Sequence, residues 1–431
     1  MFPTMGISST YLIASSKEAE LGSRTCPPAG LRAAASHTRL VERRPMMRAA
    51  KCLALLFLLA VTLTPPAASA TPSWSVKTTP NPSGNTYRSL LKGISCSEAS
   101  ACLAVGYTIN ETTFLYKALA ESWNGTQWKL QTIPSPAESE NSYLKSVACT
   151  ASNACEAVGF YTHEKGIVQA FAEHWNGTEW KLQAIPSLKS SQLHSVSCTS
   201  STSCTAVGSY LKEKFTATLV EVWNGTEWKQ QTAPNAAEKE NNTNILYGVA
   251  CPSSTSCVAV GYYAAGGFRQ PLAEKWNGTE WTKLAPKLVG ESVRFRSVSC
   301  TASNACTGVG DYWEADQEFT LAEQWNGTEW KVQKTPNPGG KENRFWGVSC
   351  TSATACIATG GAEEEDWNET EHTLAESWNG VEWLAQETPN PTGIGGYTLA
   401  AVSCVSSTHC EAVGYYMKSL GLVVTLGENY S

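Results

Sequence analysis

The sequence predicts an all-β protein: a seven-bladed β-propeller with four strands per blade, in which N- and C-terminal strands share one blade and close the ring. Two observations predict it. A cysteine pair spaced C-x5-C recurs seven times, with the first cysteines of successive pairs 49 to 54 residues apart. Each pair is followed by a variant of A/T-L-A-E-x-W-N-G-T-x-W, and no segment between the pairs has a helical period.

Each repeat divides into four short strands. The first two flank the cysteine pair, as in 193–198 and 257–262, and are rich in small and β-branched residues. The third ends at the first tryptophan, and the fourth begins just after Asn-Gly. Four short strands in about 50 residues are typical of a propeller blade. A solenoid of stacked hairpins is the alternative.

The Asn-Gly dipeptide predicts a tight type I′ hairpin between the third and fourth strands. This register would place Trp123 opposite Thr126, and Trp123 and Trp128 on one face beside Glu121. The glutamate recurs in every repeat, so we expect it to build the blade by hydrogen bonding within its own hairpin. Its seven copies are Glu121, Glu173, Glu221, Glu274, Glu323, Glu376 and Glu428.

The two ends of the repeat region complete each other. Residues 74–82 match the fourth strand at 330–338, and residues 425–430 match the third strand at 320–325. The two fragments add up to one blade. We therefore expect the terminal strands to pair, which would remove the open sheet edges of the ring.

The first 70 residues lie outside the repeat. Residues 46–70 combine a basic start, an apolar stretch at 53–63 and an Ala-x-Ala site at 68–70, which predicts a secretory signal peptide. Residues 1–45 are then an upstream extension with a mis-assigned start, although a genuine long leader is the alternative. The mature propeller would span 71–431 and be secreted to the extracellular space.

All cysteines after the predicted signal peptide belong to the C-x5-C pairs. An even number of cysteines in an exported protein indicates disulfides, and each pair lies across a five-residue hairpin loop within one blade. Zinc binding by the cysteine pairs is the less favoured interpretation, because no histidine pairs accompany the cysteines. The predicted disulfides join Cys96–Cys102, Cys149–Cys155, Cys198–Cys204, Cys251–Cys257, Cys300–Cys306, Cys350–Cys356 and Cys404–Cys410.

Charge and motifs exclude several partners. The formal net charge is −6, and the basic first 70 residues make the predicted mature chain more acidic still, which argues against nucleic acid. No second apolar run is long enough to span a membrane. The acidic run 363–366 lacks the alternating ligands of a calcium loop, so solvated charges are favoured. We expect no metal, no cofactor and a monomer.

The connections before the first and third strands vary in length, and both emerge at one end of an up-and-down blade. One first-strand position near that end, four residues before each first cysteine, also varies sharply in chemistry. Repeat proteins usually place such variation on the binding face. The ligand-binding candidates are Lys92, Lys145, His194, Tyr247, Arg296 and Trp346 at this position, and Trp313 after a second strand; the seventh ring residue is Ala400. A basic ring could hold an anionic or sugar-like ligand, or could be solvated channel lining.

The motifs C-x5-C-x-A-V-G and A-E-x-W-N-G-T-x-W resemble secreted bacterial repeat proteins of the kelch-type, galactose-oxidase-like propeller group. The resemblance spans 74–430 and implies the fold and export. The paired glycines of kelch repeats occur once, at 360–361. A copper site of the galactose-oxidase kind is not expected, because it needs a cross-linked cysteine and every mature cysteine is already paired.

Two classes of function remain open. The first is a secreted, non-catalytic propeller that binds an extracellular glycan, peptide or protein on the variable face; it is favoured because no acid, base or nucleophile set can be named. The alternative is a secreted glycan-acting hydrolase or lyase on the same scaffold, using residues at the channel mouth such as His194.

Overall fold

The computed structural model describes residues 72–82, 87–137, 139–163, 166–363 and 371–431. The predicted extension (1–45) and signal peptide (46–70) lie outside these residues. The described residues contain 28 β-strands and no α-helix, and so no helix there could cross a membrane. The predicted all-β class is confirmed.

The strands fall into groups of four, which we call units. The first strands of the units are β2 (Tyr87–Glu98), β6 (Ser139–Ala151), β10 (Gln192–Ser200), β14 (Thr243–Ser253), β18 (Ser292–Ala302), β22 (Glu342–Ser352) and β26 (Gly395–Ser406). The second strands are β3 (Ala101–Asn110), β7 (Ala154–His163), β11 (Ser203–Lys212), β15 (Ser256–Ala264), β19 (Ala305–Glu314), β23 (Ala355–Glu363) and β27 (His409–Ser419). The third strands are β4 (Tyr116–Trp123), β8 (Val168–Trp175), β12 (Phe215–Trp223), β16 (Arg269–Trp276), β20 (Gln317–Trp325), β24 (Glu371–Trp378) and β28 (Leu422–Tyr430). The fourth strands are β5 (Trp128–Gln131), β9 (Trp180–Gln183), β13 (Trp228–Gln231), β17 (Trp281–Leu284), β21 (Trp330–Val332), β25 (Trp383–Gln386) and β1 (Trp74–Lys77).

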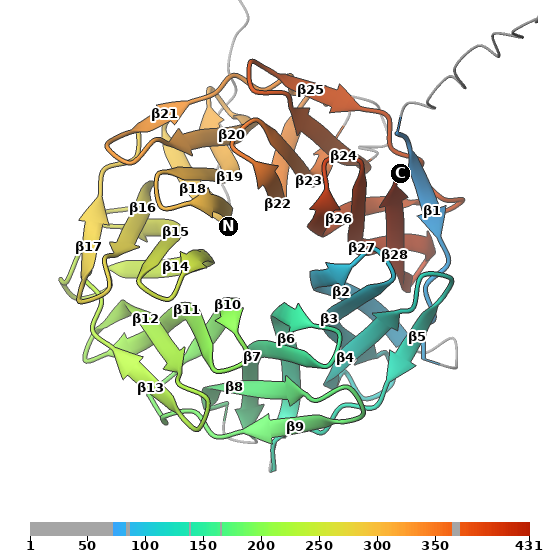
Figure 1. The fold of residues 1–431 in the computed structure, drawn as a ribbon, viewed down its shortest axis with the longest axis horizontal. Helices are drawn as coiled ribbons and strands as arrows, with labels where there is room; N and C mark the ends of the chain where they lie inside the picture. The colour runs from blue at the N-terminus through green and yellow to red at the C-terminus, as the bar shows by residue number, and fades with distance from the viewer. Residues whose placement is uncertain (1–71, 83–86, 138, 164–165, 364–370) are drawn as a thin grey trace, which may run out of the picture. The chain divides into compact units, whose positions relative to one another are not determined.

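The units are antiparallel sheets arranged around a central opening, with the first strands innermost and the short fourth strands at the rim (Figure 1). Three units are separate four-stranded sheets. Two parallel bridges, Thr216↔Thr243 and Glu318↔Glu342, join the other four units in pairs into eight-stranded sheets. The 28 strands fit seven four-stranded blades.

The two ends of the repeat region pair as predicted. Strand β1 lies antiparallel to β28, with Trp74 opposite Tyr430 and Lys77 opposite Gly427. The Thr79 hydroxyl donates to the Thr425 carbonyl oxygen at 2.8 Å and extends the contact beyond the strand. The N-terminal strand therefore completes the unit made by β26, β27 and β28.

A β-bulge interrupts every first strand at the same place. In β2 the register passes from Leu91 to Gly93, so Lys92 has no partner residue on β3. Gly106 on β3 makes room for this bulge: a Cβ there would lie 1.9 Å from the Leu90 carbonyl oxygen. A Cβ on the equivalent second-strand glycine of every other unit would lie about equally close to a carbonyl oxygen of the first strand. These glycines are Gly159, Gly208, Gly261, Gly310, Gly360 and Gly414. The repeated glycine therefore permits a bulge, which changes the direction of one first-strand side chain in each unit, such as that of Lys92.

The Asn-Gly hairpin is longer than predicted. Trp123 pairs directly with Trp128, so the loop has four residues and the expected opposition of Trp123 and Thr126 is wrong. Only Gly125 has positive φ there, and the Asn124 Oδ1 accepts the backbone N–H groups of Thr126 and Gln127. The asparagine side chain thus closes the turn that a type I′ geometry would have closed with the backbone.

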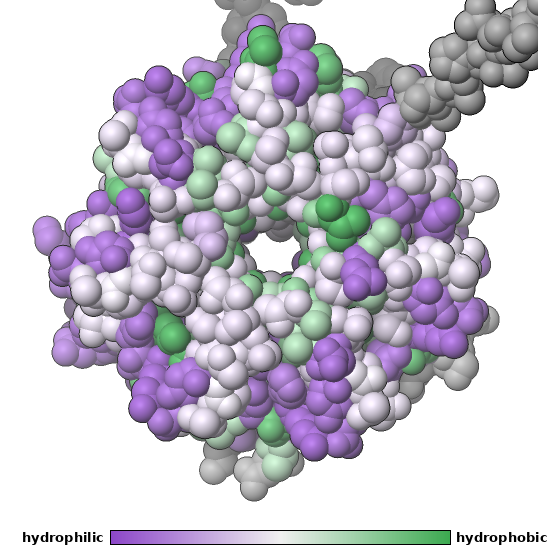
Figure 2. All heavy atoms as spheres, in the orientation of Figure 1, coloured by the Kyte–Doolittle hydropathy of each residue, from purple (hydrophilic) through white to green (hydrophobic). Residues whose placement is uncertain are grey.

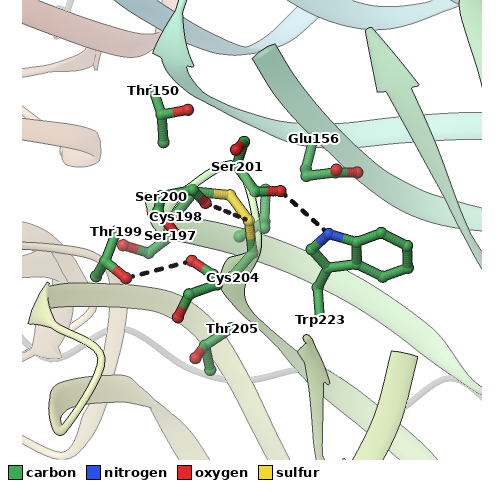
Figure 3. Close-up of a disulfide and its surroundings, with 12 residues drawn as sticks. Thr150, Glu156, Ser197, Cys198, Thr199, Ser200, Ser201, Cys204, Thr205 and Trp223 are labelled. Carbon is green, nitrogen blue, oxygen red and sulfur yellow. Dashed lines mark hydrogen bonds between the residues drawn. A yellow bond between two sulfur atoms is a disulfide. The ribbon is translucent and has the colours of Figure 1, made fainter. Parts of the chain in front are cut away.

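All seven predicted disulfides are formed, each within its own unit. The strands continue past the cysteines, so the hairpin turn is tighter than the predicted five-residue loop. The Thr199 hydroxyl donates to the Ser203 carbonyl oxygen near the Cys198–Cys204 bond. Figure 3 shows the Trp223 indole beside this disulfide, where its N–H donates to the Ser201 carbonyl oxygen at 3.2 Å. The disulfide hairpin therefore also anchors the end of the third strand.

Neighbouring units are joined by the second tryptophan of the repeat. The indole N–H groups of Trp228, Trp281 and Trp383 donate to glutamines at the ends of the preceding fourth strands, at 2.7 to 2.9 Å. The Trp330 indole is buried without a hydrogen-bond partner, and the residue at the glutamine position of the preceding unit is Leu284. The indole N–H groups of Trp74, Trp128 and Trp180 also have no hydrogen-bond partner among the described residues. The tryptophans thus pack between units, as Trp180 does against Leu103 and Val105 of the preceding unit.

The repeated glutamates do not hydrogen-bond within their hairpins, so that prediction is wrong. All seven are fully buried. Glu323 accepts the backbone N–H of Lys287, from the connection after the preceding unit, at 3.0 Å. Glu173, Glu221 and Glu274 have no hydrogen-bond partner among the described residues. Burial raises the pKa of these three to about 8, so they are protonated near neutral pH.

Candidate functional site

The bulged residues of all the units meet in one central cavity of about 340 Å³. Its lining includes all six ring-position candidates predicted from the sequence. The lining residues are Lys92, Lys145, Phe160, Gln192, His194, Tyr247, Arg296, Trp346 and Ala400. The opening seen face-on in Figure 2 is bordered mainly by weakly polar and hydrophobic residues, and strongly hydrophilic residues gather toward the rim.

On the side of β18 and β22, the arginines are paired with buried carboxylates. Asp311 is bonded by Arg294 at 2.6 Å and also by Arg296, and its side chain is only 1% exposed. Glu318, fully buried, accepts from Arg294 at 3.2 Å and also pairs with Arg344. These pairs offset the cost of burying three guanidinium groups.

Arg296 links this network to the cavity. Its guanidinium carbon lies 3.7 Å from the centroid of the Trp346 ring, which is a close cation–π contact. The pKa of Arg296 is lowered by burial, against the raising effect of Asp311. Arg296 and Trp346 thus present one rigid, partly neutralised wall to the cavity.

Trp313 lies away from this wall. Its indole N–H donates to Glu318 at 3.2 Å, so it belongs to the ion-pair network, and it does not line the cavity. The structure therefore brings six of the seven ligand-binding candidates together and leaves Trp313 apart.

On the side of β2 and β6, the cations contact aromatic rings. The Lys92 ammonium lies 4.4 Å from the ring centroid of Tyr415. The Lys145 ammonium lies 5.2 Å from Tyr107 and 5.3 Å from Phe160. Burial lowers the pKa of both lysines to about 8; Arg296 adds to the effect on Lys92, and Lys92 adds to that on Lys145.

His194 and Tyr247 close the ring between these two sides. Their ring centroids are 5.0 Å apart. Burial, with Lys145 nearby, lowers the pKa of His194 to about 3, and burial raises the pKa of Tyr247 to about 12. Both side chains are therefore neutral over the physiological range, and the positive charge of the cavity comes from Lys92, Lys145 and Arg296.

The sequence predictions did not recognise a second variable position of the repeat, whose seven residues form a set directly after the second-strand glycines. The residue after each second-strand glycine supplies the rings beneath the lysines and the carboxylate that binds Arg296. Comparison of this position across the repeats would have found it, because its chemistry varies as much as that of the bulge. The set is Tyr107, Phe160, Ser209, Tyr262, Asp311, Gly361 and Tyr415.

The chemistry of the cavity suits binding of an anion or a planar group. None of its lining residues is a carboxylate, so it lacks the acid pair that glycoside hydrolysis usually requires. Among the described residues, no cluster of three His, Cys, Asp or Glu side chains could hold a metal ion. Most of the acidic run at 363–366 lies outside those residues.

Radially arranged four-stranded sheets whose innermost strands line one cavity define a β-propeller. No protein-family model matches this chain, and no curated protein matches its sequence. Among solved structures, the GH74 xyloglucanase from Xanthomonas campestris superposes with a TM-score of 0.50 at 12% identity, over 81% of this chain and 54% of that chain. YCF48 from Cyanidioschyzon merolae gives a TM-score of 0.49 at 12% identity, over 83% of this chain and 98% of that one. At such identity the likeness concerns the fold alone.

Proposed function

We propose that this protein is a secreted, non-catalytic seven-bladed propeller that binds an extracellular ligand in its central cavity. Seven disulfides indicate an oxidising environment, which supports export. In this proposal residues 46–70 are the signal peptide, residues 71–431 form the propeller and β1 closes the seventh blade. Kinship with kelch-type propellers and a monomeric state belong to the same proposal.

One observation carries the proposal: the bulged position, whose chemistry differs between units, faces a single cavity. The bulge itself is common to all units, and residues as different as Lys92, Trp346 and Ala400 occupy it. The blade therefore does not require any particular side chain there. Side chains that are free of a packing role and converge on one cavity are suited to ligand recognition.

A glycan lyase is the alternative that a specific observation supports. A lyase needs a base to remove a proton, and the two lysines with a pKa of about 8 could act in that way. A hydrolase is less well supported, because the cavity lining has no carboxylate. Incubation with acidic polysaccharides, followed by the ultraviolet absorbance of unsaturated products, would detect lyase action.

Arrays of glycans and peptides test the binding proposal. Once a ligand is found, Trp346→Ala should weaken binding by about 2 kcal/mol, because aromatic anchors concentrate binding energy. The control is Asn326→Ala in the β20–β21 turn, which should leave affinity unchanged. If W346A binds normally and N326A loses the ligand, the assignment of the cavity is wrong.

A further inference from the structure

Lys92 and Lys145 are half-buried cations without an anionic partner. Neither ammonium forms an ion pair or hydrogen bond with another residue in the described part of the chain, and their contacts are with aromatic rings. The charges that act on them most strongly are other cations: Arg296 on Lys92, and Lys92 on Lys145. An aromatic ring attracts a cation but does not neutralise it.

The fold does not need these two charges. The equivalent bulge positions hold Tyr247, Trp346 and Ala400 in other units, and the bulges form there in the same way. Buried cations cost stability when they have no counter-ion. Adjacent lysines that are costly and structurally unnecessary point to an anion that binds between them.

The rest of the cavity indicates what carries the anion. Phe160, Tyr247 and Trp346 offer flat apolar surfaces, and Gln192 offers an amide that can bond a hydroxyl group. The volume of about 340 Å³ is near the lower end for small-molecule sites, so it suits one sugar unit better than a folded chain. An acidic sugar combines a carboxylate with a ring that can stack on aromatic faces.

We propose that Lys92 and Lys145 form an oxyanion subsite that binds the carboxylate of a uronic acid unit, with the aromatic wall contacting its sugar ring. This inference rests on the proposed function, since it names the ligand class of the same cavity. Each ammonium would donate a charge-assisted hydrogen bond to a carboxylate oxygen. Arg296 is already paired with Asp311 and orients Trp346.

Binding should be coupled to proton uptake. A carboxylate beside the lysines favours their charged forms, so affinity should fall as the pH rises through about 8. Other titratable or charged groups around them do not change charge in that range: His194 remains neutral, Tyr107, Tyr143, Tyr247 and Tyr415 have raised pKa values and remain neutral, and Arg296 remains paired with Asp311.

Calorimetric titration with glucuronate and with glucose tests the subsite. Glucose is the matched neutral probe, because it differs from glucuronate only in carrying a hydroxymethyl group in place of the carboxylate. We expect glucuronate to bind at least about tenfold more tightly than glucose, and Lys92→Met and Lys145→Met each to remove about tenfold. Lys129→Met, which changes an exposed lysine of β5, should have no effect. Glucuronate affinity should be lower at about pH 8.5 than at about pH 6.5.

Several results would overturn the subsite. If glucose binds as tightly as glucuronate, or if both lysine variants bind glucuronate normally, the lysines are not an anion site. The proposed function would still hold in that case, provided that W346A loses binding to the cavity. If acetate and sulfate compete as well as glucuronate, the sugar ring is not recognised. If only peptides with a free carboxylate bind, the ligand class is wrong. Lys92→Gln and an unfolding curve for each variant exclude misfolding as the cause of a loss.

Discussion

The two sides of the central cavity treat buried cations differently. Near β18 and β22, the arginines are bonded to Asp311 and Glu318, which are almost completely buried. Near β2 and β6, Lys92 and Lys145 lie against aromatic rings and form no ion pair with any residue that the structure describes. The same bulge in the same repeat thus presents a compensated charge on one side and an uncompensated charge on the other.

This difference assigns the two groups of cations different roles: the paired arginines stabilise the structure, and the unpaired lysines are available to bind a ligand. A buried ion pair is destabilising to break, so the arginine network fixes the shape of the cavity wall. An uncompensated cation is not required for the bulge to form, and it retains its capacity to attract an anion.

Removal of the shared carboxylate should have the largest effect. Asp311→Asn leaves Arg294 and Arg296 without their common counter-ion, and we expect a loss of about 3–5 kcal/mol in the free energy of unfolding. Urea denaturation measures it. The control is Glu179→Gln, which removes an ion pair with Lys181 whose side chains are both 60% exposed, and which should leave stability unchanged. Equal effects of D311N and E179Q would contradict the structural role of the network.

Buried carboxyls without a partner should make stability depend on pH. Burial raises the pKa of Glu221 from its ordinary value near 4.5 to about 8 in the folded protein. The folded state therefore holds a proton that the unfolded state releases between these values, and stability falls as the pH rises from about 5 to about 8.

The variant Glu221→Gln replaces the titrating carboxyl group with an uncharged amide of nearly the same size and shape. Since one pKa unit corresponds to about 1.4 kcal/mol, we expect E221Q to be close to the wild type at pH 5 and to exceed it by about 3–4 kcal/mol at pH 8. Thermal unfolding at both pH values measures this, with Glu227→Gln in the adjacent exposed turn as the control. Equal stability of E221Q and wild type at pH 8 would show that Glu221 ionises normally.

Replacement of an uncompensated lysine should stabilise the unliganded protein. Lys145→Met keeps a long apolar side chain against Tyr107 and Phe160 and removes the half-buried charge. We expect the free energy of unfolding to rise by about 1 kcal/mol at pH 7, without added ligand. A loss of stability in K145M would mean that the ammonium contributes to the fold, and the contrast between the two sides would then disappear.

The smallest effect concerns an indole without a partner. Leu284→Gln should give the buried Trp330 N–H the acceptor that Trp281 finds in Gln231, and raise stability by about 0.5–1 kcal/mol. The reciprocal change, Gln231→Leu, should cost about 1 kcal/mol because it leaves the Trp281 N–H without a partner. If both variants unfold like the wild type, the tryptophan–glutamine bonds do not join the units measurably.

The sequence was sufficient for the parts of the fold that repeat. Strand order, the disulfide pairs and the pairing of 74–77 with 427–430 follow from spacing and from matching fragments. The sequence also identified the position that lines the cavity, because its chemistry varied where its neighbours did not. These features depend on local geometry that is the same in every unit.

Other features depend on atoms that spacing does not describe. A glycine that ends a strand does not reveal the bulge beside it, which arises from the close approach of a carbonyl oxygen to Gly106 and its equivalents. The Asn-Gly loop is longer because the Asn124 side chain closes it. The pairing of Arg296 with Asp311 connects two strands of one unit, and only their register brings the two residues together.

The central claim is that Lys92 and Lys145 carry uncompensated charge in the cavity. Nuclear magnetic resonance of the lysine ε-carbons during a pH titration tests it directly, with K92M and K145M to assign the two signals. The account predicts a pKa of about 8 for both lysines in the free protein, and an increase in both values when glucuronate is added. Values near the ordinary 10.5 for both lysines, unmoved by glucuronate, would contradict it.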